Sequence, residues 1–196
     1  MNHLLRHNIA IISILIFLFG VGCSQADSDE WDQYPHDLDF AVEYWEGSLT
    51  YLNYSDDTTE ISLPASLKVE KMRADEASAN YRITFIYEEP DGSRRRNRFR
   101  IETNTTGQTM MVDGEAWQVE SRLIEGPAEE SENKIVLTRM GSDNNREARL
   151  TLTIESDYDT FTMSQAVTYV DDGTTLLRNI HFFDWRTETF FEDEAQ

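Results

Sequence analysis

Residues 147–155 read EARLTLTIE, and apolar and polar side chains alternate along this stretch without exception. Ala148, Leu150, Leu152 and Ile154 fall on one side, and charged or hydroxyl side chains fall on the other. Because successive side chains of a β-strand point to opposite faces, a period of two predicts a strand with one buried and one solvated face. An amphipathic helix would instead repeat its apolar residues every three or four positions.

Similar segments recur along the chain and predict further strands at 45–54, 61–69, 81–87, 95–103, 109–112, 115–123, 134–140, 161–169 and 176–185. Short stretches of turn-forming residues separate many of them, at 55–57, 90–93, 113–114, 142–145 and 171–173. Connections this short make neighbouring strands antiparallel. About ten sequential one-sided strands must close into a barrel or fold into a sandwich, and closure removes both exposed edges. The sequence therefore predicts an all-β fold, an up-and-down antiparallel β-barrel.

The N-terminus predicts an export signal that ends at a lipid anchor. The apolar run 9–21 follows Arg6 and is shorter than the roughly 20 residues that a spanning helix needs. The segment 20–23, GVGC, resembles a lipobox, with Gly20 where the family pattern usually has Leu. That resemblance implies acylation of Cys23, the single cysteine of the chain, as the new N-terminus.

Two other interpretations of this segment stay open. Cleavage after Ala26 would release a soluble protein, and Cys23 would pack as a small buried hydrophobe if the segment were retained. With the lipid anchor, the chain divides into a signal peptide (1–22), an acidic tether (23–38), a barrel domain (39–187) and an acidic tail (188–196). Ser24 rather than Asp follows the cysteine, and resemblance to sorted lipoproteins then implies the bacterial outer membrane, facing the periplasm.

The charge of the chain limits its partners. The net charge is −20, and loss of Arg6 with the signal makes it −21. Nucleic acid and anionic lipid surfaces would be repelled, so we expect no nucleic-acid partner and no membrane contact beyond the N-terminal lipid.

A lone cysteine excludes an intrachain disulfide, and the processed chain is long enough for one hydrophobic core. We expect a monomer.

Recognisable catalytic motifs are missing from the sequence. It has no Gly-x-Ser-x-Gly, no His-Glu-x-x-His, no phosphate loop and no second cysteine. We therefore expect no enzymatic activity, no cofactor and no metal. His181 lies between Ile180 and Phe182, which are predicted to face the interior, so it is expected to face outward and not to serve as a haem ligand.

The predicted interior is rich in aromatic side chains. A barrel of this size is either filled by side chains or holds one small ligand. One hypothesis is a binding module for a small hydrophobic or amphipathic molecule, with tyrosine hydroxyls as polar contacts. The other is a filled barrel that acts as a protein-interaction or structural module of the envelope. The candidate ligand-binding residues are Trp45, Tyr51, Tyr81, Phe85, Tyr87, Trp117, Phe161 and Tyr169, with Phe99 and Phe182 on the same predicted face.

Four arginines at spacing two stand out in this acidic chain: Arg94, Arg96, Arg98 and Arg100. Because Phe99 lies on the other face of the predicted strand, the arginines are expected to point away from the interior. The simpler interpretation is that they pair with acidic side chains on neighbouring strands. The alternative is a clamp for an anionic ligand or an acidic partner, with Arg94, Arg96 and Arg98 as its partner-binding residues.

The segment 44–47, YWEG, at the start of a ten-strand meander resembles the calycin group of lipocalins and fatty-acid-binding proteins. In that group a Trp near the start of the first strand closes one end of the barrel, and an Arg of the last strand lies across it. The resemblance implies Trp45 and Arg178 as the barrel-closing pair, with Arg186 as a second candidate. In this sequence the Gly follows the Trp, whereas the lipocalin pattern places it before.

A second resemblance, to a family of bacterial secreted lipoproteins, is carried by segments 45–54, 61–65, 141–144 and 178–179. It implies the same fold and brings no established activity.

Overall fold

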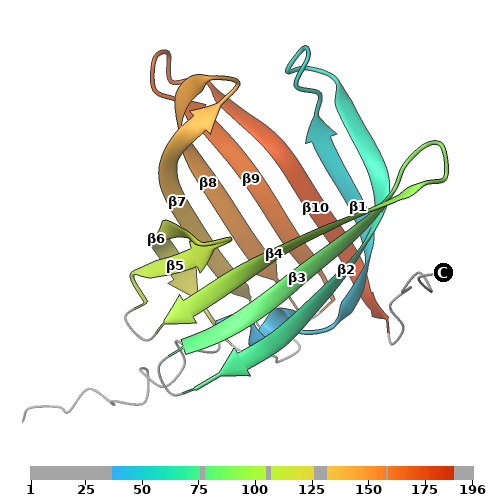
Figure 1. The fold of residues 1–196 in the computed structure, drawn as a ribbon, viewed down its shortest axis with the longest axis vertical. Helices are drawn as coiled ribbons and strands as arrows, with labels where there is room; N and C mark the ends of the chain where they lie inside the picture. The colour runs from blue at the N-terminus through green and yellow to red at the C-terminus, as the bar shows by residue number, and fades with distance from the viewer. Residues whose placement is uncertain (1–36, 76–77, 105–106, 126–131, 158, 188–196) are drawn as a thin grey trace, which may run out of the picture. The chain divides into compact units, whose positions relative to one another are not determined.

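Ten antiparallel strands of the computed structural model close into one β-barrel (Figure 1). The structure describes residues 37–75, 78–104, 107–125, 132–157 and 159–187. The predicted signal peptide, Cys23, most of the predicted tether and the acidic tail lie outside the described residues. Within the described part of the chain, no helix is long and apolar enough to cross a membrane.

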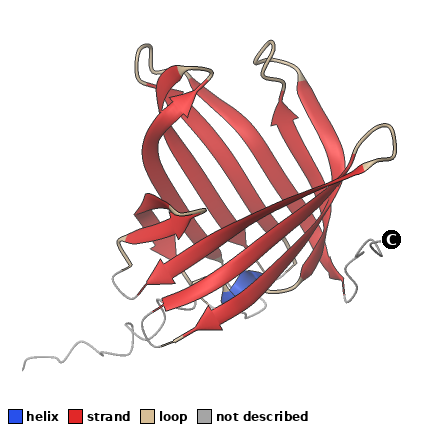
Figure 2. Cartoon of the chain, in the orientation of Figure 1, coloured by secondary structure: helices blue, strands red, loops and turns tan. Residues whose placement is uncertain are grey.

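A short 3-10 helix precedes the strands, and Figure 2 shows it at the lower end of the barrel. The elements in chain order are η3 (Asp39–Ala41), β1 (Tyr44–Leu52), β2 (Glu60–Ala74), β3 (Ser78–Glu88), β4 (Arg94–Asn104), β5 (Thr109–Val112), β6 (Glu115–Leu123), β7 (Asn133–Asp143), β8 (Arg146–Ser156), β9 (Phe161–Tyr169) and β10 (Thr175–Thr187).

Each strand pairs with its neighbours in sequence, and β1 pairs with β10 to close the barrel. The prediction of an all-β, up-and-down antiparallel barrel is confirmed. The architecture is compatible with a calycin-like fold. The predicted turns also form: in the β5–β6 hairpin, Asp113 and Gly114 both take positive φ angles, 50° and 80°, as a tight hairpin requires.

The alternation of apolar and polar residues in β8 matches the burial of their side chains. Ala148, Leu150, Leu152 and Ile154 are each at most 5% exposed, and they belong to the single hydrophobic cluster inside the barrel. Between them lie the exposed Glu147 and Arg149 and the partly buried Thr151, Thr153 and Glu155. Burial of one side-chain set per strand supplies the main stabilisation of such a barrel.

Irregular pairing shifts the alternation in β10. The register moves between Leu177 and Asn179, so that Arg178 is an extra residue in the strand. An extra residue changes which side chains face inward beyond it. His181 therefore lies opposite the inward-facing Met163 and is buried, whereas Phe182 is 43% exposed. The expectations that His181 faces outward and Phe182 inward were wrong for this reason.

Candidate functional site

The η3 end of the barrel is sealed by apolar side chains. Leu38, Phe40 and Ala41 are buried, and the indole Nε1 of Trp45 donates a hydrogen bond of 3.1 Å to the carbonyl oxygen of Ala41. The Trp45 ring also lies 5.7 Å from that of Phe161. Leu38, which the sequence placed in the tether, therefore belongs to the barrel core.

Polar contacts fix η3 to the barrel wall. The hydroxyl of Tyr81 donates to Asp39 at 2.7 Å, and Lys71 pairs with the same carboxylate at 2.7 Å. Arg122, which faces inward because β6 is irregular between Val119 and Ser121, lies 2.8 Å from the buried Asp37. Burial raises the pKa of Asp37 to about 7, although Arg122 opposes the shift.

Inward-facing side chains are less completely buried away from the η3 end. Tyr81, Ile101 and Ile135 face inward near η3 and are fully buried. Towards the other end, Tyr51, Tyr87, Phe99, Val119 and Gln165 occupy inward-facing positions but remain partly exposed. We call this partly exposed part of the interior the open half; aromatic and polar side chains line it.

A stack of aromatic rings lies inside the barrel. Phe85 stacks on the imidazole of His181 with the ring centroids 4.2 Å apart, and also on Phe99 at 5.6 Å. The hydroxyl of Tyr87 and Nε2 of His181 lie 3.0 Å apart, while Nδ1 of His181 lies 3.3 Å from the carbonyl oxygen of Met163. Burial lowers the pKa of His181 to about 4, so the ring is neutral near pH 7.

Two hydrogen-bond donors in the open half have no acceptor among the described residues. They are Nε1 of Trp117 and Nε of Arg139, both of which are buried. The guanidinium carbon of Arg139 lies 5.0 Å from the centre of the Trp117 ring, and the neighbouring Nη2 pairs with Glu115 at 2.7 Å. Indole and guanidinium groups only donate hydrogen bonds, so this point of the interior is suited to an acceptor such as a carboxylate.

The eight candidate ligand-binding residues all lie inside the barrel. Six belong to the buried cluster and two pack against it while partly exposed. The buried six are Trp45, Tyr81, Phe85, Trp117, Phe161 and Tyr169, and the partly exposed two are Tyr51 and Tyr87.

The structure does not bring Trp45 and Arg178 together. Trp45 is in register with Arg186, whereas Arg178 neighbours Asn179, which is in register with Tyr51 at the other end of β1. The predicted barrel-closing pair of Trp45 with Arg178 is therefore corrected: the Trp closes the η3 end, and the Arg lies at the open end.

Arg178 is the centre of a buried polar network at the open end. Its fully buried guanidinium donates to Asp143 through Nε at 3.0 Å and Nη2 at 2.5 Å, to Asp57 through Nη1, and to the Tyr169 hydroxyl at 2.7 Å. The Tyr54 ring centre lies 4.6 Å away. Burial alone would lower the pKa of Arg178, but the two carboxylates raise it overall. The network joins the β1–β2 loop, the end of β7 and the end of β9.

The arginines of β4 point outward, as the alternation predicted. Arg94, Arg96, Arg98 and Arg100 are all exposed on the outer face. Arg100 lies 3.9 Å from Glu102, a loose ion pair. The expectation that these side chains do not line the interior agrees with this placement.

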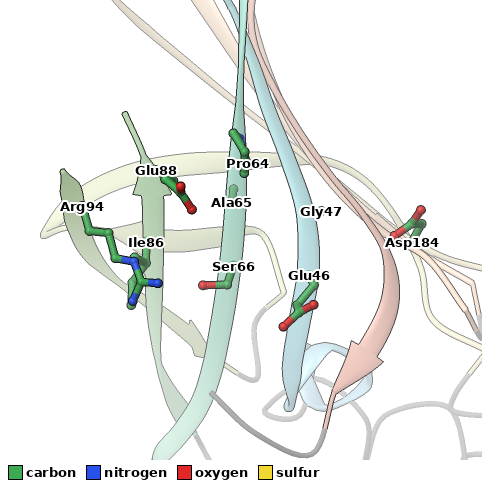
Figure 3. Close-up of a pocket in the computed structure, with 9 residues that line it drawn as sticks. All are labelled: Glu46, Gly47, Pro64, Ala65, Ser66, Ile86, Glu88, Arg94 and Asp184. Atoms are coloured by element: carbon green, nitrogen blue, oxygen red, sulfur yellow. The ribbon is translucent and has the colours of Figure 1, made fainter. Parts of the chain in front are cut away.

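A separate hollow of about 380 Å³ lies on the outer face, across β10, β1, β2, β3 and β4 (Figure 3). Glu46, Glu88 and Asp184 line it together with Arg94, and Pro64 and Ile86 are its apolar members. Three carboxylates against one guanidinium make it unsuitable for an anionic ligand.

Besides Arg122, the sequence interpretation missed the inward-facing polar residues Arg139, Gln165 and His181. Arg139 follows Leu137 by two positions and Gln165 follows Met163 by two, so the period of two would have placed both inward. They were not recognised because they are polar, whereas the other inward-facing residues of the same strands are mostly apolar. His181 had no such indication, because the shift at Arg178 is not visible in the residue pattern.

His181 makes a pH-dependent contribution to stability that can be isolated by substitution. Its pKa is near 6.5 in the unfolded chain and about 4 in the folded protein, so the unfolded state binds a proton between these values and the folded state does not. Stability from the neutral ring is present above pH 6.5 and is lost as the pH falls towards 4. We expect the free energy of unfolding of His181→Gln to fall by up to about 3 kcal/mol less than that of wild type over this pH range. Urea unfolding of both proteins at pH 7 and pH 4.5 measures it, and a pH-independent difference between them would contradict the assignment.

Comparison with known proteins assigns no family: no protein-family model matches the chain, and no curated protein is significantly similar to it.

Proposed function

We propose that this protein is a binding barrel of the bacterial envelope that takes a small amphipathic molecule with an acidic head into its open half. The observation that carries the proposal is the pair of buried donors without acceptors, Trp117 Nε1 and Arg139 Nε. A buried donor that lacks a partner costs about 1–3 kcal/mol, and a ligand carboxylate would remove that cost.

The surrounding side chains suit the apolar part of such a molecule. Tyr51, Tyr87, Phe99 and Val119 supply apolar surface that is still partly exposed. Burial of this surface by a ligand would contribute about 25 cal/mol for each Å² removed from water. The sealed η3 end then limits how far the molecule enters.

Blocking the interior tests the proposal. Gln165 faces inward opposite Leu152, and Ser164, the residue before it, belongs to the outward-facing set. We expect residues 24–196, which include every described residue, to bind a dansyl-labelled fatty acid with energy transfer from tryptophan. Gln165→Trp should weaken binding at least tenfold because the indole fills the open half, whereas Ser164→Trp should change it less than twofold.

A chemical contrast separates acid recognition from simple apolar binding. The methyl ester of the same probe lacks the anionic head and should bind at least tenfold more weakly than the acid. Absence of probe binding, or equal binding by Gln165→Trp, would refute an interior site. Equal affinity for acid and ester would refute the role of Trp117 and Arg139.

The proposal also includes the lipid anchor at Cys23, which rests on the residue pattern of the N-terminus. It places the barrel at the outer membrane, facing the periplasm. We expect the wild-type protein in the membrane fraction and Cys23→Ala either in the soluble fraction or unprocessed. Equal membrane retention of a processed Cys23→Ala protein would exclude the anchor.

A further inference from the structure

Among the described residues, half of strand β4 has an edge without a neighbouring strand. One edge of β4 pairs with β3 along its whole length, from Arg94 to Asn104. The other edge pairs with β5 only at Ile101 and Glu102. Across from it, the 139–143 part of β7 pairs with β8 but not with β6. In Figure 1 the short β5–β6 hairpin lies beside the lower part of β4 only.

The open edge presents regularly spaced backbone groups. The carbonyl of Arg100 accepts from the N–H of Asp113 at 2.9 Å, and the N–H of Arg100 donates to the Asp113 carboxylate at 2.8 Å, so both backbone groups of Arg100 point to this edge. In a strand, every second residue points the same way. The N–H and C=O groups of Arg98 and Arg96 therefore also face the edge, and within the described chain they have no hydrogen-bond partner.

The side chains on the outer face of this edge are strongly basic. Arg98 lies next to Arg100, which sits opposite Arg82 on β3, and these three arginines line a hollow of about 460 Å³. Arg82 and Arg100 make only loose ion pairs of 3.9 Å, and Arg96 and Arg98 make none with the described residues. Glu102 and Asp113 also line the hollow, at the end where β4 pairs with β5. Elsewhere the protein is acidic, with a net charge of −20.

The inner face of the same edge has a different character. Asn97 and Phe99 alternate with the arginines and face the barrel interior. A strand added at this edge would place one set of its side chains beside the arginines and the other set beside Phe99 and Asn97.

We propose that the free edge of β4 binds an extended peptide segment of a partner protein in which acidic and apolar residues alternate. The backbone of the peptide pairs with Arg96 and Arg98, its carboxylates contact the arginines on the outer face, and its apolar side chains cover Phe99. Strand addition of this kind draws affinity from main-chain hydrogen bonds and specificity from alternate side chains. The peptide site shares Phe99 with the proposed ligand site in the interior, but its backbone and arginine contacts lie on the edge and the outer face of β4.

The test uses the processed full-length protein in a non-ionic detergent and a fluorescent peptide, Ser-Glu-Val-Glu-Val-Glu-Ser, with blocked ends. We expect saturable binding by fluorescence polarisation. The double variant Arg96→Ser/Arg98→Ser should weaken it at least tenfold. The matched control Arg149→Ser removes an exposed arginine from β8, a strand that is paired on both sides, and should change affinity less than twofold.

A peptide with N-methylated backbone amides distinguishes strand addition from charge attraction, because it keeps every carboxylate but cannot complete the ladder. It should bind at least tenfold more weakly. Equal binding of the methylated peptide, or no binding of the parent peptide, overturns the proposal. If light scattering shows a dimer that Arg96→Ser/Arg98→Ser dissociates, the occupant of the edge is a second copy of the protein. If deletion of residues 188–196 raises the affinity for the peptide tenfold, the occupant is the chain's own tail. Either outcome also overturns the proposal.

Discussion

Arg178→Met should destabilise the protein by about 3–4 kcal/mol, because it removes the shared cation of a buried network and leaves its carboxylates unpaired. Asp143 would keep a carboxylate that is only 8% exposed, and Tyr169 would lose its donor from Nη2. Asp57 is 38% exposed and can be hydrated, which places the effect in the lower part of the range for broken buried pairs. The loss is measured by urea unfolding followed through tryptophan fluorescence.

Arg146→Met is the matched control for this substitution. Arg146 lies at the same end of the barrel, contacts the Tyr169 ring at 3.7 Å and pairs with Asp171 and Asp172, but its side chain is 37% exposed to solvent. Exposed ion pairs contribute little, so this variant should unfold close to wild type. Equal urea midpoints for Arg178→Met and Arg146→Met would show that the Arg178 network does not hold the loops of the open end.

Gly47→Ala should cost about 3 kcal/mol, the upper end of the usual cost of overpacking. A methyl group at Gly47 would lie 2.0 Å from the carbonyl oxygen of Phe182 and 2.6 Å from the Cα atom of Phe183. These are backbone atoms of β10, at the irregularity between Glu46 and Gly47 where β1 closes the barrel. The clash therefore cannot be relieved by rotation of a side chain, and the paired backbones of β1 and β10 must move apart.

Gly141→Ala tests whether the loss of stability is specific to the pairing of β1 with β10 or occurs at any glycine in a strand. A methyl group there meets the end of the Leu150 side chain at 2.9 Å, which can rotate away. We expect a stability within roughly 0.5 kcal/mol of wild type, because the loss of chain entropy in the unfolded state offsets the minor repacking. A Gly47→Ala protein as stable as Gly141→Ala would contradict the close approach of β1 and β10.

Most of the fold was predictable because each strand carries its own evidence. The set Ala148, Leu150, Leu152 and Ile154 determined a face of β8, and Asp113-Gly114 determined a hairpin, in each case from local residues alone. The errors came from β10, where one extra residue reverses the faces of His181 and Phe182. Irregular pairing depends on the partner strand, so a single strand does not reveal it.

The candidate site was predictable in its apolar part and not in its polar part. Aromatic residues in phase with the core indicated the interior, and all of the predicted ones except Phe182 lie there. Arg139 and Gln165 share that phase, but alternation alone does not distinguish an inward polar residue from a break in a strand. The contact of Arg178 with Asp57 and Asp143 joins residues far apart in sequence, and only the closed barrel brings them together.

Native mass spectrometry of the protein from the cells that make it tests most directly the proposed binding of an acidic amphipathic molecule in the open half of the barrel. The protein is released from the membrane in a detergent of known mass. We expect one small molecule bound per chain, beyond the covalent mass with its lipid, that is present in wild type and Ser164→Trp and absent from Gln165→Trp. The covalent mass alone in all three proteins would contradict it.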